Sequence, residues 1–148
     1  MCIYLMQHGK SYTKDINPDR PLTQEGREET ISEANQIKSK DVKISKIIHS
    51  NKIRAIETAN IFSEIIGPGI PTFFSENLNP NDDVTVLAEQ LNTSDNLMIV
   101  GHLPFLSKLA SFLLTGTIDK PIIAFKNSGV VCLEFENNNW VIQWIVVP

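Results

Sequence analysis

Three short apolar runs, each followed by a residue that can take part in catalysis, limit most strongly what this chain can fold into. The runs are residues 2–6, 46–50 and 97–100. Runs of this length are typical of strands buried on both faces, as in the middle of a parallel sheet. His8 follows the first run, Arg54 the second and His102 the third. Because adjacent parallel strands end at one edge of a sheet, where α/β folds bind ligands, we expect these side chains to converge.

The segments between and after these runs predict an α/β fold. Apolar residues recur at helical spacing over about 22–37, 52–66, 84–91 and 104–114, and further strand candidates are 72–74, 122–125, 130–135 and 140–146. The last two candidates flank a turn of three asparagines and predict a hairpin. Strands that alternate with helices and end in a hairpin predict three layers, α/β/α, in which a mainly parallel sheet has antiparallel C-terminal edge strands.

The first predicted helix carries two further expectations. Thr23 is a typical N-cap, because its hydroxyl can accept a hydrogen bond from a free amide of the first turn. We expect Leu22, Thr30, Ile31, Ala34 and Ile37 to form the buried side of this helix and the charged residues of 27–33 to form its solvated side.

Length and composition exclude several classes of protein. A chain of 148 residues fits one domain, residues 1–148. No apolar run approaches the ~20 residues of a membrane span, and the N-terminus lacks the features of a secretory signal, so we expect a cytoplasmic protein that does not bind a membrane. The formal charge of −4, without a basic run, argues against nucleic acid as a partner. Cys2 and Cys132 lie in apolar runs and predict reduced, buried thiols.

The three side chains suit a phosphoryl group better than a metal ion. Zinc needs three or four His, Cys or carboxylate ligands, and an arginine beside it repels the ion. A neutral imidazole can attack phosphorus, a guanidinium can hold two phosphoryl oxygens, and a second, protonated imidazole can offset charge on a third. Helix amides near Arg54 and His102 would add donors. We therefore expect a phosphate-binding site without a metal or a cofactor.

Four motifs in this order resemble those of the histidine phosphatase superfamily, the phosphoglycerate-mutase-like group. They are Gln7-His8-Gly9, Arg20-Pro21-Leu22-Thr23-Gln24-Glu25-Gly26, Ser50-Asn51-Lys52-Ile53-Arg54-Ala55-Ile56-Glu57-Thr58-Ala59 and Val100-Gly101-His102-Leu103-Pro104. The resemblance runs from Ile3 to about Ser111, and with the short length it points to the small SixA-type phosphohistidine phosphatase branch. It implies a single histidine phosphatase domain with a phosphoglycerate-mutase-like fold.

The resemblance also implies roles for individual residues. His8 would be the nucleophile, carrying the phosphoryl group as a phosphohistidine intermediate, while Arg54 and His102 would bind and neutralise that group. Among further candidates for substrate binding we count Gly9 and Ser11, although a plain loop serine is an equally good interpretation of Ser11. The implied partner is a phosphohistidine-bearing signalling protein, such as a histidine phosphotransfer domain, with phosphate as the product.

Gln7 departs from the family pattern, because most members have an arginine there that also grips phosphate. A glutamine still donates hydrogen bonds, but charge-assisted bonds are roughly twice as strong as neutral ones. Two alternatives therefore stay open. In the first, the chain is a catalytically weak or inactive module that only binds phosphohistidine or phosphate. In the second, it is a phosphatase of small phosphate esters. A receiver or nucleotide domain would need an acidic pocket or a glycine-rich loop after the first strand, and neither is present.

The acid that larger relatives use to protonate an alkoxide leaving group has no clear match here. The equivalent region offers Glu76, Asp82 and Asp83. Alcohols are poor leaving groups without that proton. A phosphorylated histidine leaves as imidazole, whose pKa is near 6.5, so it leaves far more easily. The unassigned acid favours an N–P bond over a sugar phosphate as the substrate.

Other polar and aromatic residues have simpler interpretations. We interpret His49 as structural, and Lys10 and Lys14 as solvated side chains that can steer an anionic partner. Trp140 and Trp144 have the same parity in a strand and predict core or interface packing.

Overall fold

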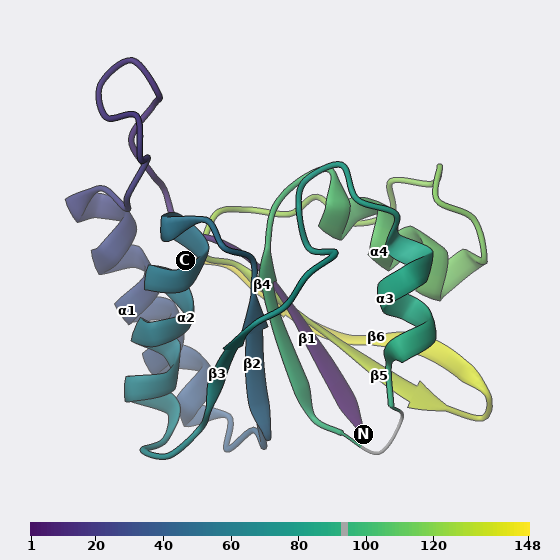
Figure 1. Ribbon diagram of the computed structural model, residues 1–148. Helices are drawn as coiled ribbons and strands as arrows, with labels where there is room; N and C mark the ends of the chain where they lie inside the picture. Colours follow the sequence, from purple (N-terminus) through teal and green to yellow (C-terminus); the bar gives the residue numbers. More distant parts are fainter. Residues whose placement is uncertain (93–94) are drawn as a thin grey trace.

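A single six-stranded sheet organises the chain, whose computed structural model describes residues 1–92 and 95–148 (Figure 1). The strand order is β3-β2-β4-β1-β5-β6. The first four strands are parallel to one another, and β5 and β6 are antiparallel to their neighbours. The strands are β1 (Cys2–Gln7), β2 (Lys46–His49), β3 (Thr72–Phe74), β4 (Leu97–Gly101), β5 (Val130–Glu136) and β6 (Asn139–Val146).

Two pairs of helices cover the two faces of the sheet (Figure 1). The helices are α1 (Gln24–Ser39), α2 (Ile53–Ile66), α3 (Val84–Gln90) and α4 (Phe105–Thr115). α1 and α2 pack on one face, and α3 and α4 pack on the other. The predicted three-layer α/β/α architecture, with a mainly parallel sheet and antiparallel C-terminal edge strands, is confirmed.

The central strand β1 is buried on both faces, as its apolar composition predicts. Leu5 belongs to the hydrophobic cluster under α3 and α4, and Met6 belongs to the cluster under α1 and α2. Successive side chains of a strand point to opposite faces, so an uninterrupted apolar run fills both layers. β4 lies on one side of β1 and β5 on the other. His8 therefore emerges from the middle of the sheet.

The first turn of α1 lies against the loop that follows β1. Thr23 is the N-cap, and its hydroxyl accepts a hydrogen bond from the Gly26 amide at 3.0 Å, as predicted. A Cβ atom on Gly26 would lie 2.1 Å from the carbonyl oxygen of Lys10. Such a distance is far inside van der Waals contact, so only glycine permits this approach of helix and loop.

The predicted division of α1 into a buried and a solvated side is wrong at two positions. Ile31 is 43% exposed, whereas Glu33 is 0% exposed. In a helix, residues three or four apart share a face, so Thr30 and Ile37 carry Glu33 to the buried side with them. The polarity of Glu33 suggested solvent, but the helical period determines where it lies. Neither carboxylate oxygen of Glu33 has a hydrogen-bond partner among the described residues.

The expected strand at 122–125 does not form. This segment has no regular structure, although Ile123 is buried against the α3 and α4 side of the sheet. Both sides of β1 and of β5 are occupied by other strands, and the segment pairs with neither edge strand of the sheet, β3 or β6. The segment therefore contributes an apolar side chain to the core without joining the sheet.

A β-bulge separates the two tryptophans of β6. The register with β5 shifts between Cys132 and Leu133, so that Gln143 is the extra residue. Trp140 packs with the α3 and α4 cluster, and Trp144 packs with the α1 and α2 cluster, where its ring lies 5.9 Å from that of Tyr4. Both pack in the core as predicted, but the bulge overrides their equal parity. Both cysteines are free thiols; Cys132 is buried as predicted, whereas Cys2 is only half-buried.

Candidate active site

A cavity of about 580 Å³ opens at the carboxyl ends of β1, β2 and β4. It is lined by Gln7, His8, Lys10, Ser11, Arg20, Thr23, Glu25, Arg54, Pro80, His102, Leu103 and Asn127. Five of the residues proposed from the sequence are in this set: Gln7, His8, Ser11, Arg54 and His102. Gly9 does not line the cavity.

The sheet register brings the three principal side chains together. Gln7 pairs with Gly101 between β1 and β4, and His49 pairs with Val100 between β2 and β4, so the strands end level. The rings of His8 and His102 lie 5.1 Å apart between centroids. Arg54, in the first turn of α2, donates from Nε to His8 Nε2 at 3.3 Å. Residues far apart in the sequence thus meet because parallel strands end at a common edge.

Neighbouring groups fix the orientation and the tautomer of the His8 ring. Its Nδ1 lies 2.7 Å from the carbonyl oxygen of Gly9 and donates a proton to it. Its Nε2, which accepts from Arg54, therefore carries the free electron pair. The pKa of His8 is lowered to about 4, mainly by burial and also by the charges of Arg54 and Arg20, against the opposing effect of the Gly9 bond. At neutral pH, His8 is an uncharged imidazole, which is the nucleophilic form.

The backbone around His8 is held from two sides. On one side, the Gly9 amide donates to Thr58 Oγ1 at 3.0 Å, and that hydroxyl donates to the Arg54 carbonyl at 2.8 Å. On the other, Asn127 Nδ2 donates to the His8 carbonyl at 3.0 Å. The Gly9 amide is therefore already used, which explains why Gly9 does not face the cavity. These bonds fix the nucleophile relative to the helix that carries Arg54.

His102 is held by Ser50, a residue that the sequence analysis did not assign to the site. The Ser50 hydroxyl lies 2.6 Å from His102 Nε2 and also accepts from the Lys52 amide at 3.3 Å. The pKa of His102 is lowered to about 3, mainly by burial and also by the nearby groups His8 and Arg54. The imidazole expected to be protonated is thus neutral unless an anion lies beside it. A phosphoryl dianion beside it would favour the protonated form again.

Arg20 is another site residue that sequence reasoning missed. It lines the cavity with a φ of 50°, and its charge lowers the pKa of both histidines. Its Nε donates to the Tyr12 carbonyl at 3.1 Å, and its Nη2 lies 3.5 Å from Ser11 Oγ. These bonds support a left-handed backbone that is unfavourable for a residue with a side chain. The available signal was its position at the start of the Arg20-Pro21-Leu22-Thr23 motif.

Gln7 lines the cavity with a half-buried side chain. Its Oε1 is buried and has no hydrogen-bond partner among the described residues. The NH2 group of the same amide is a hydrogen-bond donor only. Gln7 can therefore donate to an oxyanion, without the charge of an arginine.

Carboxylates of the 76–83 segment lie outside this cavity. Glu76 and Asp82 line a separate cavity of about 320 Å³, and Asp83 caps α3 through the Thr85 amide at 2.9 Å. The carboxylate that does line the main cavity, Glu25, forms a 2.8 Å ion pair with Lys10. Within 1–92 and 95–148, no group of three or more His, Cys, Asp or Glu side chains is arranged to hold a metal ion. No helix in this part is long and apolar enough to cross a membrane.

Comparisons with known proteins point to one family. The family model of the histidine phosphatase superfamily (branch 1) matches residues 3–79. The phosphohistidine phosphatase SixA of Escherichia coli (strain K12) is 25% identical over 154 residues, which cover 100% of this chain and 94% of that protein.

Solved structures share the fold over the whole chain. A structure of the protein histidine phosphatase SixA complexed with tungstate has a TM-score of 0.87 and 23% identity, covering 100% of this chain and 97% of that one. The alpha-ribazole phosphatase from Shigella flexneri has a TM-score of 0.78 and 15% identity, covering 97% and 95%. At these identities the structural likeness establishes the fold and leaves the choice of substrate to the site itself.

Proposed function

Because the chain belongs to the histidine phosphatase superfamily, we propose that it removes the phosphoryl group from a phosphorylated histidine of a signalling protein, with His8 as the nucleophile. The chain is a phosphatase. The observation that carries the choice of substrate is the set of groups in the cavity. It combines a neutral imidazole with two guanidinium groups, and its carboxylate is already paired with Lys10.

In the first step, His8 Nε2 attacks phosphorus while the bond from phosphorus to the substrate's ring nitrogen breaks. The substrate imidazole, protonated on its other nitrogen, leaves as a neutral ring. His8 keeps its own proton on Nδ1, where the Gly9 carbonyl accepts it. The phosphoryl group thus passes between two like groups without any proton transfer. Such an exchange needs no general acid, whereas an alkoxide would need one.

In the second step, a water molecule attacks phosphorus and the bond to His8 Nε2 breaks. The water contributes its oxygen and both hydrogens to the product, dihydrogen phosphate, and His8 returns to its neutral form. Arg54 and Arg20 can hold the phosphoryl oxygens, and His102 can neutralise charge on another once an anion restores its proton. Gln7 would add a neutral hydrogen bond. These assignments are part of the proposal.

The comparisons support this substrate class in one respect. The E. coli relative is named a phosphohistidine phosphatase, and a solved relative holds tungstate, a tetrahedral oxyanion like phosphate. The alpha-ribazole phosphatase has the same fold, so fold alone does not choose between an N–P bond and an ester. The cavity favours the N–P bond because the carboxylates of 76–83 lie elsewhere.

The test uses a histidine-phosphorylated peptide and a matched serine-phosphorylated peptide. Inorganic phosphate should be released from the first far faster than from the second. Reactions quenched in alkali, which preserves phosphohistidine, should show phosphate on His8 and none on a His8→Ala variant. Full turnover by His8→Ala would exclude the mechanism. Equal or faster cleavage of the serine phosphate would indicate an esterase, and tight phosphate binding without release would indicate a binding module.

A further inference from the structure

A second cavity, of about 330 Å³, adjoins the phosphoryl cavity and shares two arginines with it. We call it the lysine groove; its charged and amide side chains are Lys14, Asp19, Arg20, Asn51, Lys52 and Arg54. One wall is the loop between β1 and α1, which projects away from the body of the protein (Figure 1). The other wall is the start of α2. Because Arg20 and Arg54 line both cavities, a ligand held at one lies directly beside the other.

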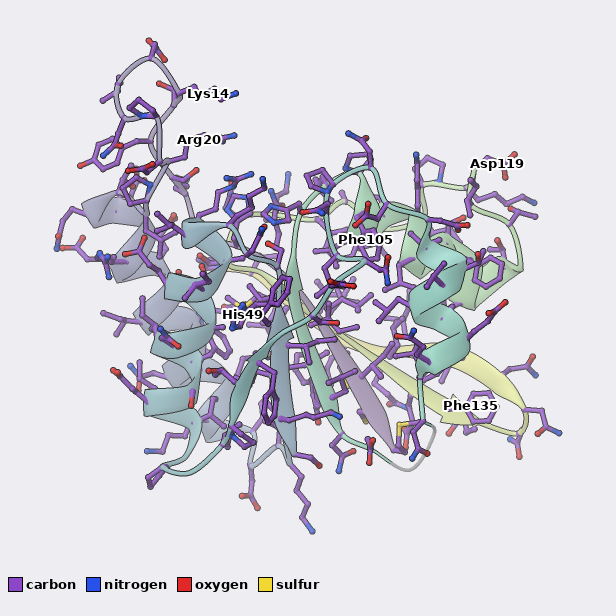
Figure 2. The ribbon with its side chains drawn as sticks, in the orientation of Figure 1. Lys14, Arg20, His49, Phe105, Asp119 and Phe135 are labelled. Carbon is purple, nitrogen blue, oxygen red and sulfur yellow. The ribbon has the colours of Figure 1, made fainter. Side chains whose placement is uncertain are left out.

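The lysine groove carries positive charge that the described protein does not neutralise. Lys14, Arg20 and Lys52 form no ion pair with any described residue, in contrast to Lys10, which is paired with both Glu25 and Glu29. Asp19 also lines the groove, but it is one carboxylate against four cations. Lys14 and Arg20 extend from the projecting loop in the same direction (Figure 2). An excess of cations in a hollow surface attracts an anionic ligand.

The start of α2 adds to this attraction. Lys52 is its N-cap and makes no side-chain capping bond, and the first turn contains no acidic residue. A helix N-terminus with free amides carries partial positive charge and favours a carboxylate or phosphate nearby. Arg54, in the same turn, is only 9% exposed and donates from Nε alone to a described side chain, His8. A buried guanidinium with donors to spare indicates that an anion completes this region.

Exposed apolar side chains lie on the segments that line the two cavities, which favours a protein over a free small anion as the ligand. Ile16 of the projecting loop is 69% exposed, and Tyr12, Ile53 and Leu103 are also exposed. Ile53 lines the lysine groove, and Leu103 lines the phosphoryl cavity. Exposed apolar side chains beside a polar site are typical of surfaces that contact another protein.

We propose that the lysine groove binds acidic side chains of the phosphoprotein that lie next to its phosphohistidine. This inference rests on the proposed function and adds a preference for acidic surroundings of the substrate histidine. Lys14 and Lys52 would form ion pairs with the substrate's carboxylates, while Arg20 and Arg54 face the phosphoryl group. The substrate would therefore be chosen by charge outside the cavity in which the phosphoryl group is transferred.

The test compares three phosphohistidine peptides that differ only in the residues flanking the histidine: glutamates, glutamines or lysines. The variant is the double charge reversal Lys14→Glu/Lys52→Glu. In the unaltered protein, kcat/KM for the glutamate peptide should exceed that for the lysine peptide by about tenfold, mainly through KM, as expected for two partly exposed ion pairs. The double variant should invert this order. Lys14→Gln/Lys52→Gln should abolish the preference without inverting it.

The matched control is Lys38→Glu/Lys43→Glu, which makes the same change of charge near the C-terminal end of α1 and in the loop before β2. It should retain the order of the unaltered protein. Because each variant is judged by the ratio of its own rates on two peptides, a general loss of activity does not imitate the effect. Inversion of a preference also cannot arise from partial unfolding.

The outcomes separate the two proposals. Equal rates on all three peptides would overturn the inference and leave phosphohistidine hydrolysis standing. A preference for glutamate that survives Lys14→Glu/Lys52→Glu would overturn the assignment to this groove. Failure to hydrolyse any of the peptides, and phosphoimidazole as well, would overturn the proposed function and this inference with it.

Discussion

The Thr58 hydroxyl accepts a 3.0 Å hydrogen bond from the Gly9 amide. Since the same hydroxyl donates to the Arg54 carbonyl, one buried oxygen joins the backbone beside the nucleophile to the helix that carries the arginine. The catalytic geometry thus depends on a side chain that does not line the cavity.

Thr58→Val should destabilise the protein and slow it. Valine has a similar shape but leaves the Gly9 amide buried without a partner, which costs about 1–3 kcal/mol of unfolding free energy. The looser nucleophile should lower kcat more than it raises KM. Urea denaturation and steady-state rates on a phosphohistidine peptide measure the two effects. Thr58→Ser keeps the hydroxyl and should restore most of both; a valine variant as stable and active as the original would contradict this role.

The low pKa of His8 predicts a loss of activity in acid. The nucleophile is the neutral imidazole, so kcat/KM should fall as the pH drops towards the folded pKa of about 4. Because the phosphohistidine of the substrate also titrates, the pH profile is compared with an NMR titration of the His8 ring. A His8 ring that titrated near pH 6.5 would show that burial does not hold His8 in its neutral form.

The low pKa of His8 also makes the stability of the folded protein depend on pH. This pKa is lower in the folded state than the ordinary value of 6.5, so the unfolded chain binds the proton first and stability falls as the pH drops below 6.5. Between pH 7.5 and pH 5, His8 should account for a loss of about 2 kcal/mol. Urea denaturation of His8→Asn should show a loss smaller by about that amount, while an exposed histidine would produce no difference.

The ionisation of Glu33 should change the stability with pH in the opposite direction to that of His8. Burial raises the pKa of Glu33 to about 7, so the folded state retains a proton that the unfolded state loses near pH 4.5. Stability from this group is present in acid and falls as the pH rises through 7. Glu33→Gln should therefore stabilise the protein by about 3 kcal/mol at pH 8 and have little effect at pH 4. Melting temperatures at both pH values test this, with exposed Glu28→Gln as the control.

Gln7→Arg should increase activity at some expense of stability. A third guanidinium adds a charge-assisted bond to the phosphoryl group, worth about 1.5 kcal/mol and hence roughly tenfold in kcat/KM. Without an anion it repels Arg54 and Arg20, so the free protein should melt at a lower temperature. Added phosphate should raise the melting temperature more for the variant than for the original. A drop in kcat/KM would show that the cavity is built around the neutral amide.

The parts of the site that follow from local sequence signals were predictable, and the rest depend on tertiary contacts. His8, Arg54 and His102 each come soon after an apolar run, so the sheet alone aligns them. Arg20 reaches the cavity because its loop folds back, with the Tyr12 amide bonded to the Pro21 carbonyl and the Thr23 amide bonded to the Lys10 carbonyl. No periodic pattern in the sequence predicts that this loop folds back.

Two predictions about the fold are wrong for the same reason. Each was made from the local sequence, whereas packing against neighbouring elements determines the structure. The exposed position of Ile31 and the burial of Glu33 follow from the rotation of α1 against the sheet, which residue polarity does not report. The 122–125 segment has the composition of a strand, but it packs Ile123 into the core and pairs with neither edge strand of the sheet, β3 or β6. Ser50 was visible only as part of a motif, since its contact with His102 crosses from one strand end to the next.

Because Gly26 has no side chain, it sets how closely α1 approaches the loop that follows His8. Alanine there would push α1 and the Lys10 backbone apart, shifting the loop beside the nucleophile while every group that meets the substrate keeps its identity. A substitution at residue 26 can therefore change the position of the loop beside the nucleophile without changing any group that contacts the substrate.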